Sequence, residues 1–156
     1  MNSQATHVNA SQHGSLPGEL GFEWMQIGRD RVTGRVEIAS KHFSPHGYLH
    51  GATIVALADS ACGFGCLASL PANAQGFVTA ELKTNFVGTI HDGFMRCDAK
   101  LVHAGRTTQV WDAEIQDEAT GKSIALFRCT QMLLYAKAGD TSSAAVSPAW
   151  TESGNP

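Results

Sequence analysis

The sequence has no excess of basic residues, no closely paired cysteine motif and no apolar segment at its start. Of its 156 residues, 11 are Lys or Arg and 14 are Asp or Glu, for a net charge of −3. Nucleic-acid-binding proteins usually present a basic patch, so the charge does not favour such a partner. Residues 1–18 are polar and lack the apolar core of a signal peptide. We therefore expect a cytoplasmic protein.

Cysteine and histidine are present, but not at the spacings of a typical metal site. The four cysteines form no CxxC pair, and two of them lie in an apolar stretch, where Cys commonly acts as a small core residue: Cys62, Cys66, Cys97 and Cys129. Three histidines recur at intervals of four: His42, His46 and His50. A helix that would align them is interrupted by a proline and a glycine. We predict no metal and no disulfide.

The length and composition predict a single domain with a full core. Hydrophobic residues make up 43% of the chain and charged residues 16%. Residues 1–17 are rich in Ser, Asn, Gln and His, and we predict a flexible segment there. The domain is expected over residues 18–137, followed by a flexible tail over residues 138–156.

Charge is almost absent from residues 49–68, which are apolar nearly all round. A helix with no polar face is a buried helix. Its length of about 18 residues could just span a bilayer. However, Asp59 near its middle would be costly there, so no membrane association is predicted. A single carboxylate in a buried helix is a candidate functional group.

Strand-like segments lie on both sides of this helix. Two precede it and four follow: Leu20–Ile27, Val32–Ala39, Gly76–Val87, Phe94–His103, Arg106–Gln116 and Ser123–Ala136. Short connections favour antiparallel neighbours. The order predicts an α+β fold in which a curved antiparallel sheet wraps one long central helix.

The first strand after the helix alternates between two sets of residues. One set is Phe77, Thr79, Glu81 and Lys83, and the other is Val78, Leu82, Thr84 and Phe86. A lone subunit would leave long strand edges unpaired, so we expect a partner to extend residues 76–87. This predicts a homodimer at least.

The run His50-Gly51-x7-Asp59 at the helix start, with strands in this order, resembles the hotdog-fold acyl-CoA thioesterases. The likeness is greatest to the PaaI and 4-hydroxybenzoyl-CoA types of aromatic compound degradation. It covers about residues 20–136 and includes the run from His103 to Thr108. The resemblance implies a hotdog fold, a homodimer or homotetramer with sites at the dimer interface, and hydrolysis of an aryl- or phenylacetyl-CoA. CoA is then part of the substrate, and no cofactor is needed.

Two residues of the motif suit thioester hydrolysis. Gly51 is at the helix start, where free N–H groups and the helix dipole attract negative charge. The resemblance implies that its N–H binds the oxyanion; an ordinary helix-start glycine is the alternative. Asp59 lies eight residues further on, about 12 Å along a helix. One helix therefore cannot bring both to one carbonyl, but two antiparallel subunits can. The resemblance gives Asp59 the role of nucleophile or general base; a structural carboxylate is the alternative.

Other site residues follow from the resemblance alone. His50 is expected to orient the helix start, with a role as general base as the alternative. Thr79 is expected to help hold the water, unless it is an ordinary strand threonine. The family usually has Asn or Gln where this chain has Ser44, whose reach is shorter, and His46 is a possible substitute. Ala52 replaces the second glycine of the usual His-Gly-Gly.

The CoA phosphates need cations or free N–H groups. Arg106, with Thr107 and Thr108 beside it, is our first choice, and a solvated turn arginine is the alternative. Further candidates are Lys83, Arg128 and Lys137. Aromatic residues that suit either an acyl pocket or the core are Tyr48, Phe64, Phe77, Phe86 and Trp111.

Two other functions remain open. A non-catalytic acyl-CoA-binding hotdog module has no need of an acid in mid-helix, so Asp59 favours the enzyme. A hotdog hydratase would pair a histidine and an acid within its site.

Overall fold

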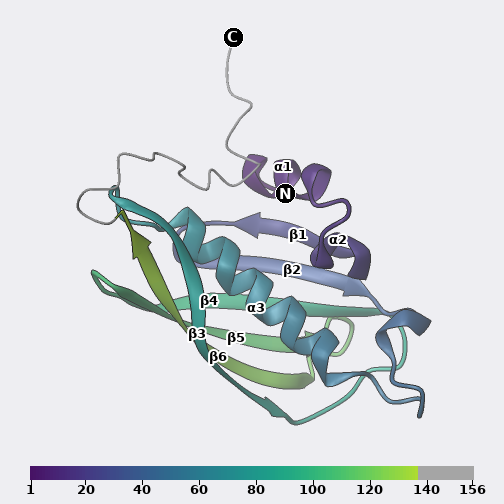
Figure 1. Cartoon of the computed structure of the whole chain (residues 1–156). Helices are drawn as coiled ribbons and strands as arrows, with labels where there is room; N and C mark the ends of the chain where they lie inside the picture. Colours follow the sequence, from purple (N-terminus) through teal and green to yellow (C-terminus); the bar gives the residue numbers. More distant parts are fainter. Residues whose placement is uncertain (137–156) are drawn as a thin grey trace.

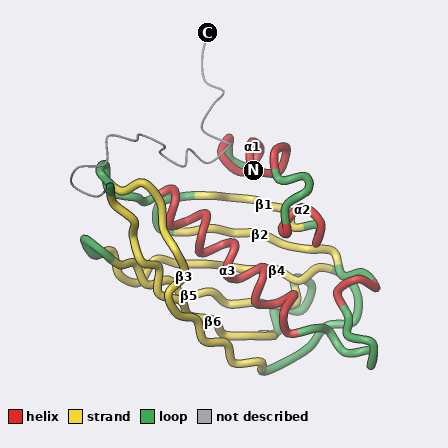
Figure 2. The backbone as a smooth tube through the Cα atoms, viewed as in Figure 1, coloured by secondary structure: helices red, strands yellow, loops and turns green. Residues whose placement is uncertain are grey.

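A computed structural model, which describes residues 1–136, has one long helix lying across the inner face of a curved antiparallel sheet (Figure 1). The sheet has six strands in the order β1-β2-β4-β5-β6-β3. Their bounds are β1 Phe22–Ile27, β2 Arg31–Glu37, β3 Ala74–Phe86, β4 Phe94–Ala104, β5 Thr108–Asp117 and β6 Ser123–Tyr135. This confirms the predicted α+β hotdog architecture. Figure 2 shows the strands curving around the helix without closing into a barrel.

The central helix α3 spans Gly51–Ala68, within the apolar stretch that predicted it. Ser69 follows as its C-cap, and Pro71 prevents the helix from continuing. Two of its glycines permit close contact with the sheet. A Cβ at Gly65 would lie 2.3 Å from the Trp111 ring on β5, and one at Gly63 would lie 3.0 Å from the Phe77 ring on β3.

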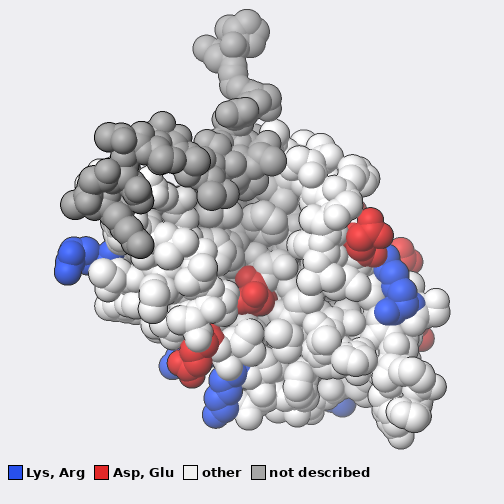
Figure 3. All heavy atoms as spheres, viewed as in Figure 1, with Lys and Arg blue, Asp and Glu red and all other residues white. Residues whose placement is uncertain are grey.

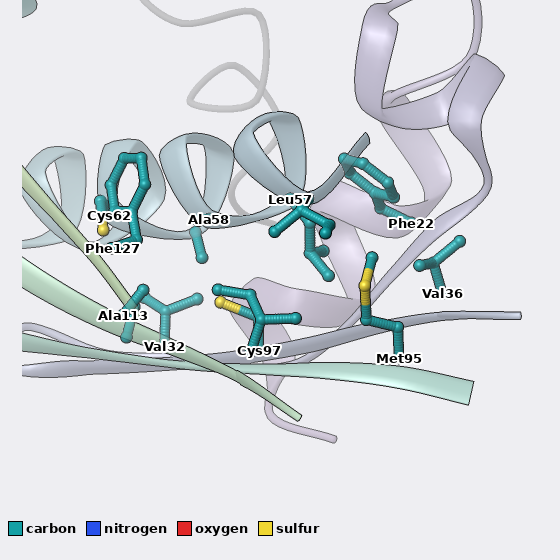
Figure 4. Packing of buried hydrophobic residues seen from close by; sticks show 14 of the residues in the cluster. Phe22, Val32, Val36, Leu57, Ala58, Cys62, Met95, Cys97, Ala113 and Phe127 are labelled. Carbon is teal, nitrogen blue, oxygen red and sulfur yellow. The ribbon is translucent and has the colours of Figure 1, made fainter. Parts of the chain in front are cut away.

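The core fills the space between α3 and the sheet. Leu57, Ala58 and Cys62 of the helix face buried side chains of the strands, including Cys97 and Phe127 (Figure 4). By length and composition α3 meets the criteria for a membrane span, as the core helix of a globular domain can. Its contacts with all six strands identify it as a core helix.

The prediction that residues 1–17 are flexible was wrong. They form two helices, α1 (Ser3–Ser11) and α2 (Leu16–Leu20), and α1 lies beside β1 (Figure 1). The side chain of Asn9 donates to the carbonyl of Trp24 at 2.9 Å and accepts from its N–H at 2.9 Å. Gln12 donates to the carbonyl of Phe22 and Asn2 to that of Ile27. These polar residues pair with the open edge of a strand instead of facing solvent, so polarity alone gave the wrong answer.

Strand β3 also differs from its predicted alternation. Phe77 packs against Gly63 and Phe86 against Gly51, so both rings face α3. They lie nine residues apart, and an odd separation in a regular strand puts side chains on opposite faces. The register between β3 and β6 shifts between Thr79 and Glu81. This bulge adds one residue and so returns Phe86 to the helix side.

The segment between β2 and α3 is a loop that begins with a short 3-10 helix, η1 (Ser40–His42). Leu20, predicted as the start of a strand, ends α2 instead. The predicted tail, residues 138–156, and Lys137 lie outside the described residues.

Candidate active site

The Asp59 side chain lines a small hollow beside α3. The hollow has a volume of about 200 Å³ and is lined by Pro17 of α2, Phe64 and Leu67 of α3, and Phe77 of β3, with Ser60 and Gly63 completing it. The Asp59 side chain is half-buried, and this burial raises the pKa of its carboxyl, while a hydrogen bond from Thr79 lowers it. A carboxylate in a largely apolar hollow is poorly solvated, and is therefore more basic than one in water.

Thr79 holds the carboxylate from the sheet side. Its hydroxyl lies 3.1 Å from Oδ1 of Asp59. The two residues are 20 positions apart in the chain, and each was predicted as a site residue. Thr79 immediately precedes the bulge in β3, a feature that often aims side chains beside functional sites. The structure therefore brings these two predicted residues together, while their roles stay predictions.

The backbone N–H of Gly51, at the start of α3, has no acceptor in the part of the chain that the structure describes. His50 is the N-cap, and its Nδ1 accepts from Ala52 N–H at 3.0 Å. Its carbonyl accepts from Thr53 N–H at 2.9 Å. Within residues 1–136, no group accepts a hydrogen bond from Gly51 N–H. His50 thus satisfies two of the first donors of the helix and leaves that of Gly51 available for an anion.

Phe86 packs over Gly51 from the end of β3. A Cβ at position 51 would lie 2.9 Å from the tip of the Phe86 ring, whose residue is 54% exposed. This packing of Phe86 therefore requires a glycine here, in addition to the predicted role of its N–H. Gly51 and Asp59 remain about 12 Å apart along one helix at about 1.5 Å per residue, as predicted.

Ser44 and His46 lie in a turn of the loop that leads into α3. Gly47 N–H donates to the Ser44 carbonyl at 2.9 Å, and Ser44 N–H donates to the Tyr48 carbonyl at 2.8 Å. Neither side chain contacts Asp59 through a hydrogen bond in the described part of the chain. Tyr48 is 71% exposed and belongs to the same loop rather than to the core.

Arg106 and Thr107 form the turn between β4 and β5, and Thr108 begins β5. The turn is anchored to β6, because Leu133 N–H donates to the Thr107 carbonyl and the Tyr135 hydroxyl donates to that of Arg106. The Arg106 side chain is exposed and makes no ion pair with a carboxylate of residues 1–136. It is therefore available to an outside anion.

Two buried residues that the sequence did not identify as site residues support this arrangement. His42 accepts from Ala39 N–H through Nδ1, and its Nε2 lies 2.8 Å from the Leu20 carbonyl. Its own carbonyl accepts from His50 N–H at 2.9 Å, so His42 anchors the start of α3. Gln131 on β6 is fully buried, and its Oε1 lies 3.0 Å from the Thr79 hydroxyl. In the sequence, Gln131 is a polar residue at one of the alternate positions of β6 that are otherwise apolar, and this pattern could have identified it.

A larger hollow of about 600 Å³ lies on the outer face of the sheet, opposite α3. Four of the charged side chains that line it form two ion pairs, Arg31 with Asp98 and Arg128 with Asp112. Lys83 also lines it. Two of the further CoA candidates, Lys83 and Arg128, therefore lie on the face away from Asp59. In contrast, the face over α3 is mostly uncharged, with one acidic area near its centre and other charges towards its margin (Figure 3).

The family model of the thioesterase superfamily matches residues 46–124, which include His50, Gly51, Asp59, Thr79 and Arg106. The 1,4-dihydroxy-2-naphthoyl-CoA hydrolase of Listeria monocytogenes (serotype 1/2a, strain 10403S) is 32% identical over 115 residues, which cover 74% of this chain and 92% of that protein. The 1,4-dihydroxy-2-naphthoyl-CoA hydrolase of Escherichia coli (strain K12) is 32% identical over 130 residues, which cover 81% of this chain and 92% of that protein.

The structural comparison agrees. A mutant of thioesterase PA1618 from Pseudomonas aeruginosa superposes with a TM-score of 0.80 at 26% identity, covering 87% of this chain and 97% of the other. The matched model spans half of the chain, and both hydrolases exceed 30% identity. The chain belongs to the thioesterase superfamily and is a hotdog-fold thioester hydrolase.

Proposed function

We propose that this chain hydrolyses an aromatic acyl-CoA thioester, with Asp59 as nucleophile or general base and Gly51 N–H as oxyanion donor. The observation that carries the proposal is the Asp59 carboxylate, which lies in an apolar hollow and is held by Thr79. Its raised pKa makes it a better base than a solvated carboxylate, and a non-catalytic binding module would gain nothing from such a group.

The reaction needs two subunits. Asp59 of one subunit takes a proton from water, or attacks directly, at a thioester carbonyl whose oxygen faces Gly51 N–H of the other subunit. The carbonyl oxygen gains negative charge as the bond to the nucleophile forms, and the N–H at the helix start stabilises it. The C–S bond then breaks, and the CoA thiolate leaves and takes up a proton. Attack by water gives the free acid directly, whereas direct attack leaves an acyl anhydride on Asp59, which a water molecule hydrolyses to the free acid and the Asp59 carboxylate.

The open edge of β3 supports a dimer of this kind. β3 is a terminal strand of 13 residues, and its outer edge pairs with no other described strand. A long unpaired edge is a template for a second chain. We propose a homodimer built across β3, with a homotetramer as the further assembly.

The acyl group is proposed to be aromatic. Phe64 and Phe77 line the hollow beside Asp59, and flat rings stack favourably on such side chains. The names of the Listeria monocytogenes and Escherichia coli relatives specify a bicyclic hydroxyaryl-CoA. A fused-ring acyl group therefore joins the aryl and phenylacetyl groups as a candidate substrate.

Arg106, with Thr107 and Thr108, is proposed to hold the CoA phosphates, with no cofactor or metal taking part. His50 is proposed to orient the helix start, and Ser44 or His46 to contact the thioester from the loop. A cytoplasmic location stays a prediction.

The test is release of free CoA thiol, followed with a thiol reagent. The substrates are 1,4-dihydroxy-2-naphthoyl-CoA, benzoyl-CoA, phenylacetyl-CoA, and hexanoyl-CoA as an aliphatic control. We expect kcat/KM for at least one aromatic thioester to exceed that for hexanoyl-CoA by about tenfold or more, as one ring in an aromatic pocket allows. Binding of all four without thiol release would favour the binding module, and a preference for hexanoyl-CoA would contradict the aromatic assignment.

A further inference from the structure

Gln131 is a buried residue whose side-chain amide lies behind Asp59 and Thr79. It lies on β6, directly opposite Thr79 of β3, and none of its surface is exposed. Its Oε1 is 3.0 Å from Thr79 Oγ1, and its Nε2 is 3.3 Å from Cys129 Sγ. A chain of polar groups therefore runs from Asp59 through Thr79 to Gln131 and ends at Cys129.

These polar groups have one proton too few for the contacts they make. Thr79 Oγ1 lies near Asp59 Oδ1, at 3.1 Å, and near Gln131 Oε1, at 3.0 Å, but a hydroxyl has one proton to donate. If Asp59 is ionised and the amide is oriented this way, one of the two oxygen pairs has no proton between its members. A buried contact of that kind is unfavourable.

Two arrangements remove the conflict. In the first, Asp59 is ionised and the Gln131 amide is turned over, so that Nε2 donates to Thr79 Oγ1, the hydroxyl donates to Asp59, and the Cys129 thiol donates to Oε1. In the second, Asp59 carries a proton and donates it to Thr79, whose hydroxyl donates to Gln131 Oε1. The two amide orientations differ only by exchange of O and N.

We propose that Gln131 is a positioning residue for the reaction: by donating to Thr79, it directs the Thr79 hydroxyl at the ionised Asp59 carboxylate. This inference rests on the proposed function of Asp59. Hydrogen bonds in such a chain polarise and strengthen one another in a low-dielectric interior. Gln131 thus favours the ionised acid without contacting it, and fixes the direction in which the carboxylate faces.

Few other groups in the described chain compete for this role. The remaining residues that line the hollow carry no charge. Two thiols adjoin these polar groups: Cys62 on α3 interacts electrostatically with Asp59 and Cys129, and Cys129 on β6 contacts Gln131. The contact with Cys129, together with burial, raises the pKa of the Cys62 thiol, so this thiol is neutral at the pH of the reaction.

The test is a double-mutant cycle of Gln131→Met and Thr79→Val, read out as the pH profile of kcat/KM. Met has a similar volume but cannot donate to Thr79. We expect Gln131→Met alone to lower kcat/KM about tenfold near neutral pH, the effect of one hydrogen bond. We also expect it to move the acid limb to higher pH. In the Thr79→Val background, Gln131→Met should move the acid limb no further, because the hydroxyl that links Gln131 to Asp59 is already absent.

Gln109 provides the matched control. It is also a buried glutamine and pairs with Gln131 in the neighbouring strand, but its side chain bonds to Ser69 and Trp111. Gln109→Met should lower the melting temperature while leaving the acid limb in place. Equal shifts of the limb in both glutamine variants, or additive shifts in the cycle, would overturn the proposal.

Two further measurements keep the result interpretable. If Gln131→Met does not fold, Gln131→Asn withdraws the amide from Thr79 and should shift the limb in the same direction; an unmoved limb would overturn the proposal. The acid limb of the wild type must also disappear in Asp59→Asn. A wild type without such a limb would contradict the role of Asp59 itself, which is a different failure from an unmoved limb in the Gln131 variant.

Discussion

The two edges of the sheet are treated in opposite ways. At the β1 edge, side-chain amides of Asn2, Asn9 and Gln12 bond to the backbone as another strand would. At the other edge, β3 is twice as long, with 13 residues against six, and has no such cover in the described chain. A protein that closes one edge and leaves the other open restricts association to the open one.

The open edge also lies beside the proposed active site. β3 carries Thr79, which bonds to Asp59, and Phe77 and Phe86, which pack on α3 beside the two ends of the proposed site. The β1 edge carries none of the proposed site residues. In the proposed dimer, assembly and chemistry are therefore coupled at β3, whereas α1 covers the β1 edge.

The largest effect is expected from Asp59→Asn, which removes the negative charge of this side chain with little change in its shape. General-base catalysis contributes about 10²–10⁴-fold, so kcat should fall by at least about 10²-fold with little change in CoA binding. Single-turnover thiol release and binding of a substrate analogue measure the two quantities. A folded variant with nearly wild-type turnover would remove Asp59 from the mechanism.

The same variant should be more stable than the wild type near neutral pH. Burial raises the pKa of Asp59 in the folded state, so folding disfavours its ionised form. This penalty is fully present above the raised pKa and disappears below the unfolded value of about 3.9. The gain in unfolding free energy of Asp59→Asn should therefore shrink as the pH falls towards 4. A gain that grows with falling pH would contradict the burial argument.

A smaller effect is expected at the β4–β5 turn. Arg106→Ala should raise KM for CoA thioesters several-fold with kcat little changed, as for a contact made equally in ground and transition states. The ratio should decrease in high salt, since exposed charge pairs are screened. Arg29→Ala, in the turn between β1 and β2, is the control and should leave KM unchanged.

The β1 edge should respond in stability and not in catalysis. Asn9→Leu removes two hydrogen bonds to Trp24, so we expect a loss of about 1–3 kcal/mol in unfolding free energy. Asn85→Leu on β3, an exposed residue, should cost much less. Denaturant unfolding measures both, and kcat should be unaffected in each. A larger cost at Asn85 would reverse the proposed difference between the edges.

The elements that depend on local pattern were predictable from the sequence. The all-round apolar stretch predicted α3, alternation and turns predicted six strands, and Asp59 was conspicuous as the only charge in the helix. Its partner Thr79 came from the family resemblance, and the structure brings the two within hydrogen-bond distance.

What the sequence missed depends on contacts between distant segments. Helix α1 has no apolar stripe, and its buried hydrophobic residues are Ala5 and Val8. Amides of Asn9 and of the capping residues Asn2 and Gln12 bond to β1 instead. The bulge after Thr79 exists only in relation to β6, so the alternation of β3 appeared regular. Gln131 lies on the same buried side of β6 as Phe127, Cys129 and Leu133. A polar residue among these alternating apolar positions was the sequence feature that could have identified it.

Subunit mixing tests the shared site most directly. Gly51→Pro deletes the N–H at the first helical position, where proline is well tolerated, and the exposed Phe86 ring has room to move away. Asp59→Asn and Gly51→Pro proteins should each be nearly inactive. When the two variants are mixed in equal amounts and their subunits exchange, about half of the dimers become heterodimers. Each heterodimer has one intact site out of two, so about a quarter of wild-type activity should return. If heterodimers form, as seen by native mass spectrometry, and activity stays at the level of the parents, the site is not shared between subunits.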